Sequence, residues 1–234
     1  VNFAEHTVSR VAVVSDVIRN GRPVTGIAFD SIGRFAQSGL MRERFIKRLS
    51  AAKPEEIANA SGDGIDTAKA FQVMMRNEKP GGHGDRAHAV AALELALWDL
   101  NAKLMDEPAW QTIARHHNVQ ASPRMPVYAA GGYYYPSDNL GRLQDEMRGY
   151  GDQGYRKFKM KIGGATLSED MRRIEAALAV VGDPENLAVD ANGRFDIPTA
   201  LAYGRAMEGF GLRWYEEPGD PLDYRLMNEL AAVY

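Results

Sequence analysis

The sequence has 234 residues, 45% of them hydrophobic and 25% charged, as is usual for a globular protein with a sizeable core. Its formal net charge of −3 gives no electrostatic reason to expect binding to nucleic acid or to an anionic membrane, and no apolar run is long enough to span a bilayer. The absence of cysteine excludes disulfides and thiolate metal sites in this sequence and is compatible with a cytoplasmic protein. Neither nucleic acid nor a membrane is therefore an expected partner.

The first part of the chain predicts an α+β domain, which we place at residues 1–122. Two apolar runs flank Asn20 and Gly21, a dipeptide typical of the type I′ turn in a β-hairpin. Helical periodicity follows, and Asp85 is expected to cap the longest helix. The predicted elements are a hairpin at 10–29, a loop at 30–39, helices at 40–52 and 66–76, a loop at 77–86, and helices at 87–104 and 108–114.

The rest of the chain, residues 123–234, alternates strands with helices. A step of 29 residues separates Lys161 from Asp190, and a step of 26 separates Asp190 from Glu216. A (β/α)₈ barrel of ~250 residues uses ~30 per unit, so the repeat indicates parallel strands joined by helical crossovers. The predicted strands are 127–130, 157–162, 187–190 and 212–216, and the predicted helices are 140–149, 168–181, 198–209 and one from Pro221.

Four βα units cannot close a barrel, and the fourth strand would leave a long unpaired edge. We therefore expect the sequence to stop within the fold, with roughly four further βα units beyond Tyr234 in the intact protein. The alternative is a complete open sheet that resembles half a barrel. The predicted fold class is α/β: the first half of a (β/α)-barrel, preceded by an α+β domain.

Charged side chains collect at the carboxyl ends of these predicted strands. Lys157, Lys159 and Lys161 alternate with apolar residues, so a period of 2 places all three on one face. Asp190 and Glu216 end the next two strands, where the ends of parallel strands converge. Carboxylates are the hard oxygen ligands that Mg²⁺ prefers, and extrapolation of the repeat predicts a third ligand at about residue 242.

Lys161 is nearest the expected mouth of the barrel. A lysine beside a divalent cation and another ammonium has its charged form disfavoured, so it can act as a base on a proton α to a carboxylate. The metal would stabilise the enediolate. Lys159, one pleat back, could hold the substrate carboxylate, and Asn192, two residues after Asp190, could bond a substrate oxygen.

Each feature also has an interpretation without function. Alternating lysines are often the solvated face of an antiparallel strand, although a parallel sheet covered by helices has no such face. Asp190 could be a turn residue, and Glu216 could belong to a solvated strand end. The occurrence of all three features at successive strand ends favours a site.

The motifs K-M-K-I-G, V-D-A-N and W-Y-E-E-P, in this order and spacing, resemble the enolase superfamily and its mandelate racemase-like branch. The resemblance extends over the whole sequence and implies a capping domain followed by the first half of a modified barrel. It further implies that Lys161 is the general base and that Lys159 is its partner on the substrate carboxylate. Asp190 and Glu216 are, by the same resemblance, ligands of Mg²⁺.

Other implications come from the resemblance alone. Lys79, in the loop of the capping domain, would contact the substrate. A histidine and a third metal ligand from later strands would complete the site, and a further strand would precede the hairpin. The family commonly forms homo-oligomers, so the resemblance implies one here.

Four longer motifs resemble the D-tartrate dehydratases within this branch: V-A-V-V-S-D-V, N-E-K-P-G-G-H-G, V-Y-A-A-G-G-Y-Y-Y-P and V-D-A-N-G-R-F. They imply Mg²⁺-dependent dehydration of a small hydroxy acid, with D-tartrate to oxaloacetate as the leading expectation. Dehydration of another acid sugar, or racemisation of a 2-hydroxy acid, would share the same first step. A non-catalytic metal-binding fragment is the alternative outside enzyme chemistry.

Overall fold

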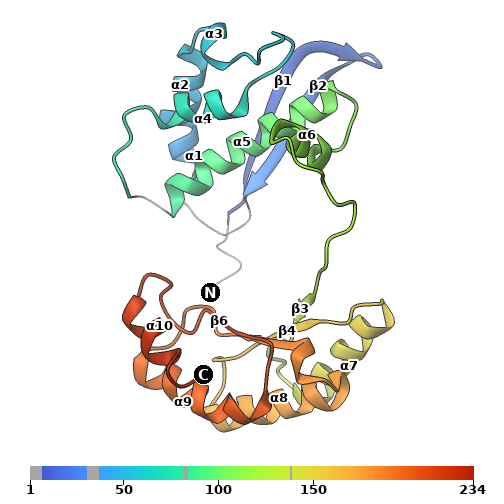
Figure 1. Cartoon of the computed structure of the whole chain (residues 1–234), viewed down its shortest axis with the longest axis vertical. Helices are drawn as coiled ribbons and strands as arrows, with labels where there is room; N and C mark the ends of the chain where they lie inside the picture. Colours follow the sequence, from blue (N-terminus) through green and yellow to red (C-terminus); the bar gives the residue numbers. More distant parts are fainter. Residues whose placement is uncertain (1–6, 31–36, 82–83, 138) are drawn as a thin grey trace. The chain divides into compact units, whose positions relative to one another are not determined.

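The structure is a computed structural model that describes residues 7–30, 37–81, 84–137 and 139–234. The chain divides into two compact units, Val1–Pro123 and Arg124–Tyr234 (Figure 1).

The first unit begins with the predicted hairpin. Strands β1 (Ser9–Arg19) and β2 (Arg22–Asp30) pair antiparallel, and Arg19 lies opposite Arg22 across the turn. Asn20 and Gly21 both have positive φ, 52° and 73°, as the type I′ turn requires, so this prediction is confirmed. Most of the predicted loop at 30–39 lies outside the described residues, and the chain is helical from Gln37 onwards.

Helices pack on this hairpin, with α5 against both strands. The predicted cap of α5 is wrong, because Asp85 is already its first helical residue and Gly84 takes the capping position without a side-chain bond. Asp66 does cap α4, where it accepts from the Lys69 N–H. The helices are α1 (Gln37–Leu40), a π-helical turn (Met41–Phe45), α2 (Ile46–Ala51), α3 (Pro54–Ile57), α4 (Thr67–Met75), α5 (Asp85–Leu104) and α6 (Ala109–His116).

The second unit is a parallel four-stranded sheet in the order β3-β4-β5-β6, with a helix after each strand. This confirms the predicted α/β class and the βα repeat. The elements are β3 (Ala129–Gly131), α7 (Asn139–Asp152), β4 (Phe158–Lys161), α8 (Leu167–Val181), β5 (Leu187–Asp190), α9 (Ile197–Met207), β6 (Tyr215–Glu216) and α10 (Tyr224–Leu230), with 3₁₀ turns at Pro184–Asn186 and Glu208–Phe210.

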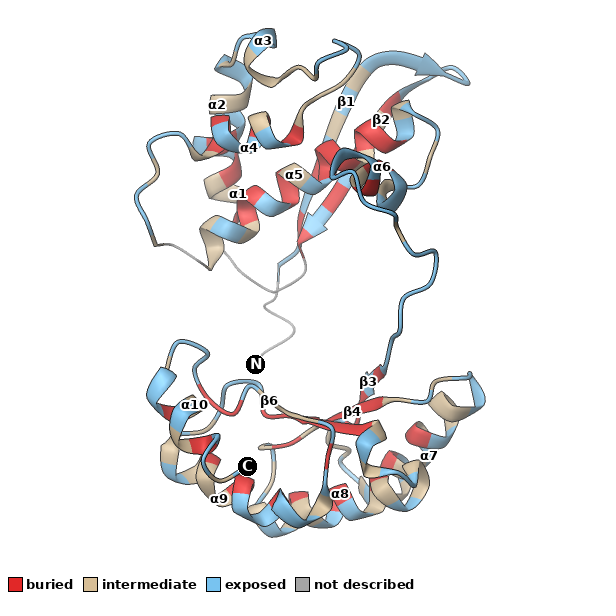
Figure 2. Cartoon of the chain, in the orientation of Figure 1, coloured by how far each residue is buried: buried red, intermediate tan, exposed pale blue. Residues whose placement is uncertain are grey.

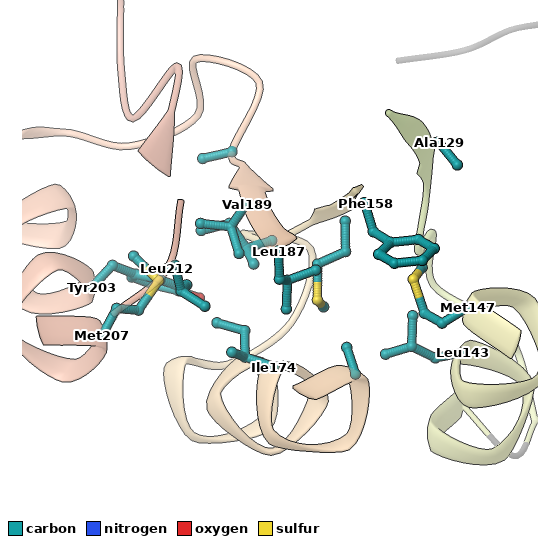
Figure 3. Close-up of a cluster of buried hydrophobic side chains, with 14 residues drawn as sticks. Ala129, Leu143, Met147, Phe158, Ile174, Leu187, Val189, Tyr203, Met207 and Leu212 are labelled. Atoms are coloured by element: carbon teal, nitrogen blue, oxygen red, sulfur yellow. The ribbon is translucent and has the colours of Figure 1, made fainter. Parts of the chain in front are cut away.

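The core of this unit lies between the sheet and helices α7, α8 and α9, which cover the same face of it (Figures 1 and 2). Phe158 and Met160 of β4, with Leu187 and Val189 of β5, point into this core and are almost completely buried. Figure 3 shows how side chains of all three helices meet those of the strands. Because strand residues alternate, Lys159, Lys161 and Asp190 lie on the opposite face of the sheet.

Side-chain caps set where the crossover helices begin. Thr166 accepts from the Glu169 N–H before α8, Asp196 from the Thr199 N–H before α9, and Asp223 from the Leu226 N–H before α10. Each such cap stabilises its helix by about 1 kcal/mol. The loops after β4, β5 and β6 therefore each end at a defined residue, which fixes them beside the charged face.

Candidate active site at the carboxyl ends of β4, β5 and β6

Two lysines and two carboxylates form a continuous chain of ion pairs on the charged face of the sheet. Lys161 Nζ donates to Asp190 Oδ2 at 2.6 Å. Lys159 Nζ lies 3.1 Å from the same oxygen and donates to Glu216 Oε1 at 2.6 Å. The structure therefore brings together four of the residues that were singled out from the sequence.

The register of the parallel strands produces this arrangement. Lys161 lies opposite Asp190, and Asp190 lies opposite Glu216, so one charged residue of each strand shares a single row. Lys159 is one pleat earlier, opposite Ala188, and its long side chain reaches up to that row. Because Ala188 is small, the ammonium of Lys159 can lie between the two carboxylates.

Because the side chains of Lys159 and Asp190 are buried, the pKa of each depends on its charged neighbours. Lys159 is 8% exposed and Asp190 is 2% exposed. Burial works against the ammonium of Lys159, but the carboxylates of Glu216 and Asp190 outweigh it and raise the pKa of Lys159. Burial likewise works against the carboxylate of Asp190, but hydrogen bonds from Lys161, the Asn192 N–H and Lys159 outweigh it and lower the pKa of Asp190.

Aromatic rings that the sequence analysis did not single out surround this row. Trp214 Nε1 donates to Glu216 Oε2 at 2.8 Å, and the Trp214 ring packs edge-on against Tyr128 at 5.4 Å. The Lys159 Nζ lies 5.5 Å from the centre of the Tyr128 ring. Trp214 is two residues before Glu216, so strand alternation alone would have placed it on the same face.

Tyr133 lies beside the other lysine. The Lys161 Nζ is 5.8 Å from the centre of the Tyr133 ring, within the range of a cation–π contact. Tyr133 follows β3, whose last residue Gly131 pairs with Met160. The phenol is half exposed, so it can meet a ligand as well as the lysine.

Asn192 does not continue the alternation of β5. The strand ends at Asp190, and Asn192 has a φ of 51°, in the left-handed region of a turn. Its main-chain N–H donates to Asp190 Oδ1 at 2.8 Å, whereas its side-chain Nδ2 is 3.3 Å from Glu217 Oε2. Its main chain thus orients Asp190 and its side chain reaches Glu217, while its contact with a substrate oxygen stays a prediction.

Two further lysines lie apart from the row. Lys157 precedes β4, and its Nζ donates to Asn186 Oδ1 at 3.3 Å, at the opposite end of the strands. Lys79 is exposed in the first unit, where its carbonyl accepts from Arg86 at 2.7 Å. The substrate contact expected of Lys79 stays a prediction.

The donor set of Asp190 and Glu216 suits a hard divalent cation. The Lys159 ammonium lies between their oxygens, which shows that the space between the two carboxylates accepts positive charge. Mg²⁺ is often held by one or two carboxylates and completes its octahedron with water and substrate oxygens. Among the described residues no group of three or more His, Cys, Asp or Glu side chains is placed to hold a metal ion, so Asp190 and Glu216 are the candidate ligands.

Comparison with known proteins shows the family of the chain. Residues 142–233 match the family described as enolase C-terminal domain-like. An arabinonate dehydratase of Saccharolobus solfataricus is 31% identical over 192 residues, which are 80% of this chain and 48% of that protein. The chain belongs to the enolase superfamily.

Other known proteins align over nearly all of the chain. An L-talarate/galactarate dehydratase of Salmonella typhimurium is 30% identical over 230 residues, 96% of this chain and 53% of that protein. The crystal structure of a racemase from Streptomyces coelicolor A3(2) with bound magnesium superposes with a TM-score of 0.75 and 26% identity, over 97% of this chain and 63% of that one. The chain spans about half the length of the curated relatives it matches.

A further solved structure resembles the chain in fold. The crystal structure of a member of the enolase superfamily from Polaromonas sp. JS666 shares the fold, with a TM-score of 0.74 and 22% identity over 97% of this chain and 61% of that one. Within the part of the chain that the structure describes, none of the helices is long and apolar enough to cross a membrane.

Proposed function

We propose that the chain carries the general base and two metal ligands of a Mg²⁺-dependent dehydratase acting on a small hydroxy acid or acid sugar. The ion-paired row of Lys161, Asp190, Lys159 and Glu216 carries this proposal. It is supported by the relatives, which are named as dehydratases of arabinonate and of talarate or galactarate. The magnesium bound to the Streptomyces coelicolor racemase supports the choice of metal.

In the proposed reaction, the Nζ of Lys161 in its neutral form removes the proton on the carbon next to the substrate carboxylate. Bound Mg²⁺ would supply the positive charge that stabilises the enolic oxygens as they become negative. The ammonium of Lys159 binds the same carboxylate and takes up part of its growing charge. Asp190 and Glu216 outweigh burial and raise the pKa of Lys159, so Lys159 stays an ammonium while it binds the carboxylate.

Loss of the β-hydroxyl as water completes the dehydration. The electron pair left by the α-proton forms the C=C bond as the C–O bond breaks, and the enol then tautomerises to a keto acid. We expect a histidine from a later strand to protonate the leaving hydroxyl, as the family resemblance implies. For D-tartrate the products are oxaloacetate and one water, which balances the reaction.

D-tartrate is the first substrate that we propose, on the strength of the four longer motifs. Lys79 and Asn192 would then add contacts to the second carboxylate or to the hydroxyl groups. A five- or six-carbon acid sugar is the alternative that the named relatives favour. Racemisation of a 2-hydroxy acid shares the proton abstraction and is favoured by the likeness to a racemase.

The test is turnover by the intact protein with Mg²⁺ on D-tartrate, arabinonate and galactarate, each followed as keto acid and as exchange of the α-proton in D₂O. Lys161→Ala is expected to lower kcat by about 10²- to 10⁴-fold, as loss of a general base does. Lys157→Ala is the matched control, because Lys157 lies at the other end of β4 and contacts Asn186. It should leave kcat within about twofold.

The outcomes separate the alternatives. Exchange together with keto acid supports a dehydratase and identifies its substrate. Exchange without keto acid, with inversion at the α-carbon, supports a racemase. Binding of Mg²⁺ without exchange on any of these acids would favour a metal-binding protein without catalysis and overturn the proposal. We also expect a homo-oligomer, which light scattering of the intact protein would test.

A further inference from the structure

A second cluster of charge lies on the helix side of the sheet and is completely buried. Asp170 and Arg173, one turn apart on α8, have no exposed surface, and Arg173 Nη1 is 3.1 Å from Asp170 Oδ1. The Arg173 guanidinium stacks on the ring of Tyr134, with 3.8 Å between its central carbon and the ring centre. A buried ion pair in a hydrophobic layer has a desolvation cost, so its partners indicate its purpose.

Arg173 binds the ends of two strands through their main chains. Its Nη1 donates to the carbonyl of Lys161 at 2.8 Å, and its Nη2 donates to the carbonyls of Gly132 at 2.6 Å and Tyr133 at 3.2 Å. Lys161 ends β4, and Gly132 and Tyr133 follow β3. One planar guanidinium thus fixes the main chain of the proposed base relative to that of Tyr133, whose ring lies against the base.

Asp170 holds the other side of the same turn. Its Oδ2 accepts from the main-chain N–H of Gly163 at 2.7 Å and from the Tyr203 hydroxyl at 2.9 Å. Its Oδ1 accepts from the Tyr134 hydroxyl at 2.7 Å. The carbonyl before Ile162 is therefore held by a cation and the N–H after it by an anion, both from one turn of α8.

Stability alone does not account for this arrangement. Replacement of a buried ion pair by apolar residues is often neutral or stabilising, whereas a hydrogen-bonded polar network can specify a single geometry. Both Nη atoms of Arg173 have acceptors, whereas its Nε has none among the described residues. Lys161 reaches Asp190 from a main-chain position that Arg173 sets. An error of about 1 Å in such a position can cost about 10²-fold in rate.

We infer that Asp170 and Arg173 are positioning residues that hold the end of β4, and through it the Nζ of Lys161, in register with Tyr133. The inference rests on the proposed function for the role of Lys161. We call Asp170 and Arg173 with their main-chain hydrogen bonds the clamp, and its existence rests only on those contacts. Both residues bind the main chain, so a substitution at either one should displace Lys161 without removing it.

The decisive variant is Arg173→Lys, which keeps the charge but cannot donate to three carbonyls from one plane. We expect kcat for the acid that the wild type dehydrates to fall at least about 10-fold while KM stays within about threefold, because the base is misplaced but carboxylate binding is kept. Hydrogen exchange, followed by mass spectrometry without substrate or metal, should accelerate in peptides covering residues 131–134 and 159–164 before the rest of the unit.

Ile174→Ala is the matched control. Ile174 is the next residue on α8, is completely buried and belongs to the apolar core. Its truncation should lower the melting temperature and raise exchange throughout the second unit, yet leave kcat of the folded protein within about twofold. Equal loss of kcat in both variants at matched stability would overturn the inference.

Tyr203→Phe keeps the test falsifiable if Arg173→Lys does not fold. It removes one hydroxyl that donates to Asp170 and keeps the ring, which stacks on Phe195 at 4.4 Å. Local exchange at residues 159–164 should rise and kcat fall, in the same direction but by a smaller factor. No local change would overturn the clamp. Should the wild type act on none of the acids, the proposed function fails, and the exchange data still support or overturn the clamp.

Discussion

The indole of Trp214 donates to Oε2 of Glu216 at 2.8 Å, while Lys159 occupies Oε1 at 2.6 Å. Both oxygens of this proposed metal ligand are therefore held, one by a neutral donor and one by a cation. Trp214 thus orients the carboxylate of Glu216, which would hold a bound metal, as partners of metal ligands do.

Trp214→Phe should weaken Mg²⁺ binding by about 10-fold or more, because Glu216 loses the donor that orients it. Isothermal titration of the intact protein with Mg²⁺ measures this directly. Trp110→Phe is the control, since Trp110 is partly exposed on α6 in the first unit. An unchanged dissociation constant for the Trp214 variant would remove the indole from the metal site.

Asp190→Asn should lower the free energy of unfolding by about 3 kcal/mol, because it leaves two lysine ammonium groups without their shared buried partner. Urea unfolding at pH 7 checks the value. Asp220→Asn is the matched change at an exposed carboxylate whose side chain accepts from the Leu222 N–H, and it should cost less than about 1 kcal/mol. Equal costs would mean that the row contributes little to stability.

The dependence of stability on pH follows from the same row. The pKa of Asp190 is lowered in the folded state, so its contribution is present above the unfolded value of about 4 and is lost as pH falls through the folded value. The pKa of Lys159 is raised, so its contribution is present below the unfolded value of about 10.4 and is lost as pH rises towards the folded one.

The contribution of these two groups to the urea concentration at the unfolding midpoint should therefore be constant between about pH 5 and 10. It should fall below and above that range. Lys159→Met removes the group that titrates on the alkaline side, so the fall above pH 10 should become shallower than in the wild type. A Lys159 variant with an unchanged alkaline limb would contradict the assignment.

Gly132→Ala should destabilise the second unit more than Gly182→Ala does. Both glycines have positive φ, 64° and 83°, where an added Cβ costs about 1–2 kcal/mol. Only at Gly132 would the new Cβ also meet a side chain, with Met160 Cβ 2.5 Å away, which adds about 1–3 kcal/mol of overpacking. Thermal unfolding of the two variants gives the comparison, and equal melting temperatures would contradict it.

Periodicity and spacing sufficed to predict most of the second unit. Alternation predicted that Lys159 and Lys161 share a face, and the regular steps predicted the row with Asp190 and Glu216. The limits of short strands were less accurate: β3 begins at Ala129, because Val127 and Tyr128 are apolar but lie before the residues that pair with β4. The functional roles of Lys159, Lys161, Asp190 and Glu216, as opposed to their positions, stay predictions.

Other features depend on contacts that one-dimensional patterns do not contain. Asp170 and Arg173 look like charges in the first turns of an exposed helix, where acidic residues favour the helix dipole. Only the packing of α8 under β3 and β4 reveals them as buried. The turn at Asn192 likewise depends on where the pairing of β5 with its neighbouring strands ends, which is at Asp190. Asp85 is not the cap of α5, because this helix starts two residues earlier than its periodicity indicates.

The placement of Lys159 between Asp190 and Glu216 makes the row electrically neutral, two ammonium groups against two carboxylates. A divalent cation arriving alone would leave two uncompensated positive charges in a half-buried space. A dianionic substrate such as tartrate arriving with it would restore the balance, and a monoanion would offset half of the added charge. The metal ion and the carboxylate substrate should consequently increase each other's affinity, so that the protein binds the two as a pair and loss of one weakens binding of the other.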